Sequence, residues 1–128
     1  MDTRIFEGVR VLDFTDFLAG PLCGMYLADF GADVIKVENL RAGGNFVRNA
    51  MPREKKTNRS MYFQNLNRNK RAVALDLKSE EGKKLFAELI KSSDVLVQNN
   101  RPGVMERLGF GWEEVHALNP RLIYASVS

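Results

Sequence analysis

The sequence has a single cysteine, a single histidine and no long apolar run, and each of these shortages excludes a class of protein. Cys23 has no second cysteine with which to form an intrachain disulfide, which fits a reducing compartment. No apolar stretch approaches the roughly 20 residues that a membrane-spanning helix needs. Residues 1–7 lack the apolar region of a secretory signal. We therefore predict a cytoplasmic protein with no membrane partner.

Side chains that carry chemistry are also sparse, and no pair of them forms a complete active site. His116 has no Cys, Asp or Glu at metal-ligand spacing, so we expect it at the surface or boundary and predict no metal site. Cys23 is expected to pack within an apolar helix rather than to react. Asp13 and Asp16 flank a predicted turn and are expected at the surface or as caps, and Trp112 is expected to anchor the start of a helix.

What is present is the composition of an ordinary globular protein. The chain has 128 residues, of which 45% are hydrophobic and 27% charged. This length suffices for one domain with one real core. We therefore predict a single domain over residues 1–128.

Segments of strand and helix character alternate along the chain. Strands are expected at 8–14, 34–38, 72–77, 94–97 and 121–126. Helices are expected at 21–30, 79–91, 102–108 and 112–118; Pro21 is expected to begin a largely buried helix, and Ser79 to act as an N-cap. Strands linked through helices pair in parallel, with right-handed crossovers. The order therefore predicts an α/β fold with a Rossmann-like, doubly wound and mostly parallel sheet.

A long segment at 39–60 interrupts this alternation and has little periodicity. We interpret it as a functional or mobile loop that ends in a short helical or extended piece at 61–63. Positive charge gathers around it, since residues 41–78 hold ten Lys/Arg and two Asp/Glu, whereas the remainder holds nine and fourteen. A phosphate-bearing partner and a solvated basic loop both account for this asymmetry.

In an open parallel sheet, ligands bind beyond the carboxyl ends of the strands. Those ends are predicted at 15–20, 38–39, 78, 98–101 and 126–128, which together form one rim. A nicotinamide or flavin site is disfavoured because residues 15–21 do not form a GxGxxG turn, and Pro21 lacks a backbone N–H. A nucleic-acid partner is disfavoured because the sequence has no RNP-type motif or zinc-knuckle spacing.

Several ordered motifs together resemble one known family. They are GVRVLD at 8–13, LAGP at 18–21, LADFGADVIKVE at 27–38, NRNKR at 67–71, LDLKSEEG at 75–82, RPGVMERLG at 101–109 and NPRLIY at 119–124. In this order and spacing they resemble class III CoA-transferases of the formyl-CoA:oxalate and carnitine type. The α-methylacyl-CoA racemases are related to that family, and the resemblance covers nearly the whole chain.

The resemblance implies a Rossmann-like large domain that binds coenzyme A, within a longer chain that forms an interlocked homodimer. It implies a CoA thioester and a carboxylic acid acceptor as substrates, and no prosthetic group. The residues that it places around CoA are Leu18, Ala19, Asn39, Leu75, Asp76, Leu77, Lys78, Asn99, Asn100, Arg101 and Arg107. Lys78 and Arg107 are expected to meet phosphates, because charge-assisted hydrogen bonds to anionic acceptors are strong.

Strand direction separates the cations around the third predicted strand. Lys78 follows that strand at the carboxyl edge of the sheet, so it is expected to contact the ligand. Arg68, Lys70 and Arg71 enter at the opposite edge. We expect at least some of these three to be structural or to face a dimer partner.

Two positions depart from the pattern of formyl-CoA transferases. Those enzymes have a glutamine where this chain has Leu18, which argues against formyl or oxalate as the substrate. They have an arginine where this chain has Asn39, so a phosphate contact there would need Arg41 as a substitute. Asn39 is compatible with the carnitine-type branch.

The catalytic aspartate of the family is expected beyond Ser128, so no catalytic residue is assigned within this chain. That aspartate attacks the acyl-CoA carbonyl and forms a mixed anhydride, from which CoA passes to the acceptor acid. We expect the chain to be truncated after its last strand and to be inactive alone. A racemase of the same family and an inactive CoA-binding or dimerisation fragment are the alternatives.

Overall fold

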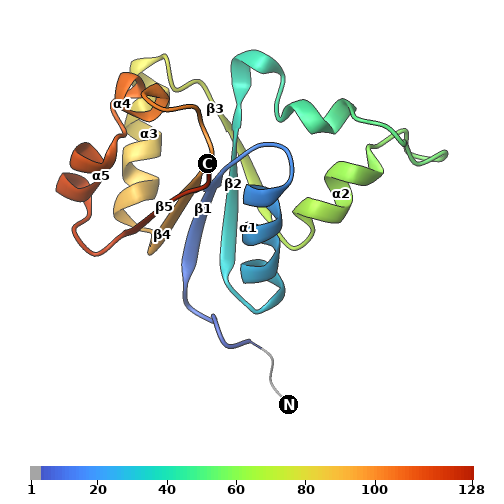
Figure 1. The fold of residues 1–128 in the computed structure, drawn as a ribbon, viewed down its shortest axis with the longest axis horizontal. Helices are drawn as coiled ribbons and strands as arrows, with labels where there is room; N and C mark the ends of the chain where they lie inside the picture. The colour runs from blue at the N-terminus through green and yellow to red at the C-terminus, as the bar shows by residue number, and fades with distance from the viewer. Residues whose placement is uncertain (1–3) are drawn as a thin grey trace.

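The computed structural model describes residues 4–128 and contains one five-stranded sheet in the order β3-β2-β1-β4-β5 (Figure 1). The strands are β1 (Arg10–Phe14), β2 (Asp33–Asn39), β3 (Arg71–Leu75), β4 (Val95–Gln98) and β5 (Ile123–Ser126). All four neighbouring pairs are parallel. The predicted α/β fold is therefore confirmed. Residues 1–3, part of the stretch expected to lack a secretory signal, lie outside the described residues.

The helices cover both faces because the chain reverses its direction across the sheet. From β1 it moves outward to β3, with α1 (Ala19–Asp29) and α2 (Met61–Asn67) on one face. It then returns past β1 to β4 and β5, and α3 (Glu80–Lys91), α4 (Val104–Leu108) and α5 (Trp112–Leu118) cover the other face (Figure 1). Right-handed crossovers require this arrangement, since the outward and return connections run in opposite directions.

The face under α3 holds the larger hydrophobic core. Phe86 of α3 is fully buried, and its ring lies 5.7 Å from that of Phe14 and 4.7 Å from that of Phe110, centroid to centroid. Ser79 caps the helix as predicted, because its Oγ accepts a hydrogen bond from the Gly82 N–H at 3.0 Å. The other buried members are Leu12, Ile35, Val37, Leu75, Leu77, Ile90, Leu96, Met105, Val115 and Leu122.

Helix α1 departs from the prediction in its start and in its burial. It begins at Ala19, and Pro21 is tolerated inside its first turn because N–H groups there have no partner within the helix. The expectation that the helix is buried on most sides is wrong, since Tyr26 and Phe30 are 54% and 44% exposed. Cys23 is exposed as well, so the prediction that it packs is also wrong. These three residues are spaced along one face of the helix.

The segment after β2 is more ordered than predicted. It contains the 3-10 helices η1 (Leu40–Ala42) and η2 (Phe46–Asn49), and an isolated antiparallel bridge joins Arg53 to Ser60. The carboxylate of Glu38, at the end of β2, accepts hydrogen bonds from Arg48 at 2.6 and 2.7 Å and from the Asn45 N–H at 2.6 Å. These contacts hold the part of the segment around η2 against the sheet, so the predicted functional or mobile loop contains more regular structure than its sequence indicated. Of the two forms expected at 61–63, the helical one is observed.

Strand β3 ends at Leu75 rather than at residue 77. The carbonyl of Asp76 accepts a hydrogen bond from the Ser79 N–H at 3.0 Å, which turns the chain toward α3. Lys78 therefore lies in the β3–α3 turn and does not directly end the strand. The remaining strand boundaries differ from the predicted ones by one or two residues.

Half of the cations of residues 41–78 are paired with acids of the same molecule. Five of its ten cations form the ion pairs Arg41–Asp76, Arg48–Glu38, Arg68–Asp29, Lys70–Asp13 and Arg71–Asp33. All but one of these acids come from outside the basic segment. The expectation that Arg68, Lys70 and Arg71 include structural residues is confirmed. Within residues 4–128, every helix is too short or too polar to cross a bilayer.

Candidate functional site

A cavity opens where the chain connections diverge at the carboxyl edge of the sheet. Strands β1 and β4 are neighbours, but the chain leaves β1 toward α1 on one face and leaves β4 toward α4 on the other. Such a switch point is where open parallel sheets bind ligands. The cavity has a volume of about 920 Å³. It is lined by residues 17–19, 98–103, 105, 106, 112, 124 and 126–128.

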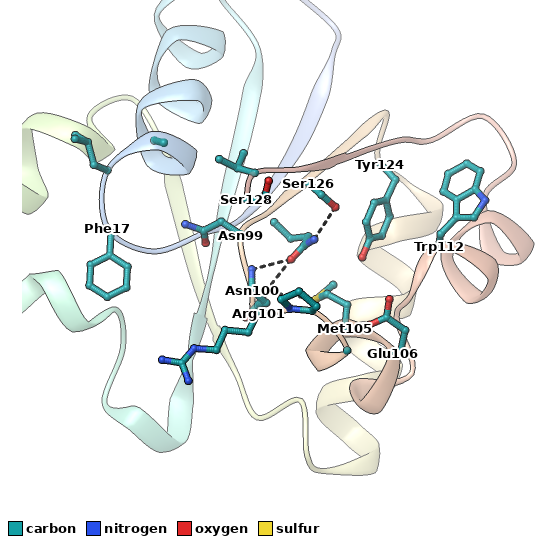
Figure 2. Close-up of a pocket in the computed structure, with 16 residues that line it drawn as sticks. Phe17, Asn99, Asn100, Arg101, Met105, Glu106, Trp112, Tyr124, Ser126 and Ser128 are labelled. Carbon is teal, nitrogen blue, oxygen red and sulfur yellow. Dashed lines mark hydrogen bonds between the residues drawn. The ribbon is translucent and has the colours of Figure 1, made fainter.

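Aromatic side chains lie at the two ends of this cavity. Phe17 lies at one end, and Trp112 and Tyr124 lie at the other (Figure 2). Trp112 is 48% exposed and stacks on His116 with 4.8 Å between the ring centroids. The Tyr124 hydroxyl donates a hydrogen bond to the Phe110 carbonyl at 3.2 Å, and burial raises its pKa to about 12. Trp112 begins α5 as predicted, and it also lines the cavity.

Gln98 fixes the floor of the cavity at the end of β4. Its Nε2 donates a hydrogen bond to Ser126 Oγ at 2.7 Å, and its Oε1 accepts one from the Asn100 N–H at 2.8 Å (Figure 2). These bonds join β4 to β5 and to the turn that follows β4. The side chain of Arg101 leaves this turn and points away from Trp112 and Tyr124 (Figure 2).

A smaller cavity of about 120 Å³ lies along the same edge, beside the end of β3. Its lining residues are Phe14, Asn39, Arg41, Leu75, Asp76, Leu77, Lys78 and Leu108. Arg41 Nε donates a hydrogen bond to Asp76 Oδ2 at 2.6 Å, and this bond, together with the one from the Lys78 N–H, lowers the pKa of Asp76. Arg41 is thus close to Asn39, where a substitute for the missing arginine was expected.

The two cavities divide the residues that the family resemblance places around CoA. Leu18, Ala19, Asn99, Asn100 and Arg101 line the larger cavity. Asn39, Leu75, Asp76, Leu77 and Lys78 line the smaller one.

Arg107 lines neither cavity. It lies on α4 and is exposed. Its Nη1 lies 2.9 Å from the position that a Cβ of Gly103 would take. The guanidinium therefore lies beside the loop that carries Arg101, outside both cavity walls.

The turn between β1 and α1 forms one wall of the larger cavity, and we call residues 15–18 the rim turn. Phe17 within it has a φ of +66°, a left-handed conformation that is unusual for a bulky residue. The main chain of Asp16 is held from β4, because its N–H donates to Asn99 Oδ1 at 2.9 Å and its carbonyl accepts from Asn99 Nδ2 at 2.8 Å. Both polar ends of the Asn99 side chain are therefore occupied by the rim turn.

A fully buried charge cluster lies below the rim turn. The Asp13 carboxylate accepts hydrogen bonds from Lys70 Nζ at 2.6 Å and from Thr15 Oγ1, and it lies 3.8 Å from Lys36 Nζ. The side chains of Asp13, Lys36 and Lys70 are at most 1% exposed. Gly24 makes room for the cluster, since a Cβ there would lie 2.8 Å from Asp13 Oδ2. The expectation that Asp13 is a surface or capping residue is wrong.

Burial and pairing shift the ionisation of groups around this cluster. Burial lowers the pKa of Lys70 despite the opposing effect of Asp13. Burial raises the pKa of Asp16, whose carboxylate accepts a hydrogen bond from Asn45 Nδ2. Burial alone would also raise the pKa of Glu38, but the Arg48 guanidinium and the Asn45 N–H together hold it below its ordinary value.

Sequence reasoning missed the burial of Lys36 and the aromatic ends of the cavity. A signal for Lys36 was available, because it interrupts the apolar run of β2 between Ile35 and Val37. A lysine in a strand covered on both faces requires a buried acceptor. Within residues 4–128, no three His, Cys, Asp or Glu side chains lie close enough together to hold a metal ion.

Comparisons with known proteins give a consistent result over nearly the whole chain. A family model described as CoA-transferase family III matches residues 6–128. The chain is 49% identical over 125 residues to a formyl-CoA:oxalate CoA-transferase from Bradyrhizobium sp. (strain ORS 278), which covers 98% of this chain and 29% of that protein.

Solved structures agree with the sequence comparisons. A CAIB/BAIF family protein from Brucella suis is 35% identical with a TM-score of 0.90, covering 98% of this chain and 34% of that protein. A hypothetical protein from Mycobacterium tuberculosis is 43% identical with a TM-score of 0.84, covering 94% of this chain and 32% of that protein. The chain thus spans about a third of the length of the relatives that it matches.

Proposed function

Because this chain belongs to CoA-transferase family III, we propose that it is the CoA-binding part of an enzyme that moves CoA from an acyl-CoA donor to a carboxylic acid. One observation carries the proposal. Ten of the eleven residues that the family resemblance assigns to CoA line two cavities along a single edge of the sheet. That edge is also where the strand order alone predicts ligand binding.

The family resemblance assigns the two cavities to the two ends of CoA. In this arrangement the adenosine end lies at the smaller cavity, against Leu75 and Leu77, and the pantetheine thioester lies in the larger one beside Leu18. Lys78 and Arg101 supply cations at the smaller and larger cavity respectively. Phosphates are the groups of CoA that gain most from such donors, because the hydrogen bonds are charge-assisted.

The chemical step that we propose uses an aspartate outside the 128 residues. Its carboxylate attacks the acyl-CoA carbonyl and the CoA thiolate leaves, which forms a mixed anhydride. The thiolate then attacks the aspartyl carbonyl, which releases the donor acid and leaves an aspartyl thioester. In reverse order, the acceptor acid takes up CoA and regenerates the carboxylate. The chain itself contributes binding and orientation.

We propose that the enzyme works as a homodimer whose subunits interlock. The exposed apolar face of α1, with Cys23, Tyr26 and Phe30, supports an additional covering surface. The names of the relatives favour transfer of CoA over racemisation. An aspartate that reacts with acyl-CoA, found beyond Ser128, would separate the transferase from a racemase that uses an acid–base pair.

For the acyl group, we propose a substituent larger and less polar than formyl. The relative from Bradyrhizobium is named for formyl-CoA and oxalate. Here the cavity presents Phe17 and Leu18, which are 59% and 52% exposed. Neither side chain offers a hydrogen bond to a small polar acyl group, whereas both gain by covering an apolar one.

The binding proposal predicts that the full-length protein binds CoA at one site. Lys78→Ala and Arg101→Ala should each weaken this binding by about tenfold. Each change removes a charged donor beside one cavity. Isothermal titration calorimetry measures both effects. Lys84→Ala on α3 is the matched control, because Lys84 is exposed and lines neither cavity. Equal losses in all three variants, or no binding by the wild type, would contradict the proposal.

The acyl proposal predicts that Leu18→Gln shifts the ratio of kcat/KM for formyl-CoA over butyryl-CoA upward by about tenfold or more. The amide supplies a donor and an acceptor where leucine supplies only apolar surface. Steady-state assays with both thioesters give the ratio. Leu40→Gln is the control, since Leu40 is 57% exposed on η1 and lines neither cavity. A higher kcat/KM of the wild-type enzyme for formyl-CoA than for butyryl-CoA would contradict this proposal.

A further inference from the structure

We propose that Lys36 is a positioning residue of the larger cavity: its buried ammonium holds the Thr15 carbonyl and thereby fixes the rim turn. This inference rests on the proposed function in one respect, since it treats the cavity as the site that receives the CoA thioester. It assigns a role in binding to a residue that touches no ligand.

The position of Lys36 needs an explanation beyond packing. It lies in the middle of β2, with its side chain 1% exposed and its Nζ 2.8 Å from the Thr15 carbonyl oxygen. Its nearest carboxylate, that of Asp13, is 3.8 Å away, at the long limit of an ion pair. Moving an ammonium out of water costs several kcal/mol, and apolar residues of similar volume often do as well or better for stability. The carbonyl of Thr15 is therefore its principal partner.

The rim turn requires such a restraint. Phe17 adopts a left-handed backbone conformation that costs roughly 1–2 kcal/mol for a residue with a Cβ. Conformations of this kind persist only where surrounding contacts determine them. Phe46 adds one contact, with 5.9 Å between its ring centroid and that of Phe17, but both rings are largely exposed. The remaining restraints are polar: the Thr15 and Asp16 side chains bond to Asp13 and Asn45, and the main chain accepts and donates further hydrogen bonds.

One peptide unit concentrates these contacts. The carbonyl of Thr15 accepts from Lys36 and, at 3.3 Å, from Asn45 Nδ2. The N–H of the same peptide group, that of Asp16, donates to Asn99 at the end of β4. Hydrogen bonds on the two ends of one peptide polarise one another. The unit thus links β2 to β4 across β1. Phe17 and Leu18, which follow it and line the cavity, are thereby held in place relative to the sheet.

Lys70 provides a natural comparison within the same cluster. Its Nζ donates to Asp13 at 2.6 Å, to the Pro21 carbonyl at 2.7 Å and to Asn67 Oδ1 at 2.9 Å. None of these acceptors belongs to the rim turn. Both lysines are therefore buried beside one carboxylate, but only Lys36 donates directly to the rim turn, whereas Lys70 reaches it through Asp13, which accepts from Thr15 Oγ1.

The test compares Lys36→Met with Lys70→Met in the full-length protein. Urea unfolding should show that both variants lose stability. Calorimetry with CoA should show Kd raised about tenfold or more in Lys36→Met and within about twofold of wild type in Lys70→Met, because misplacement of a binding group is costly. With acyl-CoA as substrate, the loss in Lys36→Met should fall on KM more than on kcat. Equal Kd values in the two variants would overturn the inference.

A second measurement keeps the test decisive if Lys36→Met does not fold. In wild-type protein, nuclear magnetic resonance should detect scalar coupling across the hydrogen bond between Lys36 Nζ and the Thr15 carbonyl carbon. The Asp16 amide should exchange with solvent within about tenfold of the β1 amides. Absence of the coupling, or exchange of the Asp16 amide as fast as that of an unprotected peptide, would overturn the inference. Wild-type protein that binds no CoA would instead overturn the proposed function.

Discussion

Replacing Asp13 with asparagine is expected to lower the free energy of unfolding by about 3–5 kcal/mol. Asp13 is fully buried and is the carboxylate shared by the ammonium groups of Lys36 and Lys70. Asparagine keeps the shape, so the change creates no cavity. It leaves two ammonium groups in a site where no water can replace the lost charge, and breaking a buried pair from one side carries this large cost.

Urea unfolding followed by circular dichroism measures this loss, and Asp33→Asn is the matched control. Asp33 also accepts hydrogen bonds from two cations, Arg10 and Arg71, but its side chain is 37% exposed. Exposed ion pairs contribute about 0–1 kcal/mol, so the control should lose no more than that. Similar losses at both positions would show that burial of the Asp13 cluster is not what makes it costly to break.

Replacing Phe86 with alanine is expected to lower the free energy of unfolding by about 3–5 kcal/mol through loss of buried area and creation of a cavity. The ring is fully buried between α3 and the sheet. It also contacts Phe110 edge to face and Phe14 at a tilt, and such aromatic pairs contribute beyond their buried area. Surrounding side chains relax only partially after such a truncation, so part of the cavity remains.

Leu85→Ala is the control for this change, because Leu85 precedes Phe86 on the same helix and is 56% exposed. Its loss should stay within about 0.5 kcal/mol, as for most surface substitutions. The midpoints in urea give the two values if the slopes agree. If Phe86→Ala lost no more stability than Leu85→Ala, the core under α3 would not be tightly packed.

Local signals were sufficient to predict α3. Ser79 provides an N-cap, and Phe86 and Ile90 fall on one face at helical spacing. Helix α1 has no such signal, because its own apolar residues are distributed around most of its circumference. The sequence therefore does not indicate which side packs against a neighbour. The exposure of Tyr26 and Phe30 depends on what packs there, which is a property of the assembled fold.

The location of the candidate site could be predicted from the sequence. The contacts that hold its walls in place were harder to predict. The rule that ligands bind beyond the carboxyl ends of parallel strands places Leu18, Asn99 and Lys78 at one edge without any structure. Arg107 lies outside both cavities because the direction of a side chain on a short helix depends on its packing.

The buried charge cluster shows why the rest could not be predicted from the sequence. Asp13 stands beside a turn, where aspartate is ordinarily exposed. Its burial follows from a partner, Lys70, that lies 57 residues away in the chain. Residue type predicts an average environment, whereas a buried ion pair is decided by two distant residues together.

The order of the strands also sets the order in which the protein can assemble. Strands β1, β2 and β3 pair with sequence neighbours, so that half of the sheet is complete once residue 75 has been synthesised. The central pair is different, because Val11 of β1 meets Val95 of β4 across 84 residues. Pairing at such separation is slow, since a long loop must close first. During synthesis, one edge of β1 therefore stays unpaired until β4 has been made. The larger cavity forms only after β4 and β5 have joined the sheet.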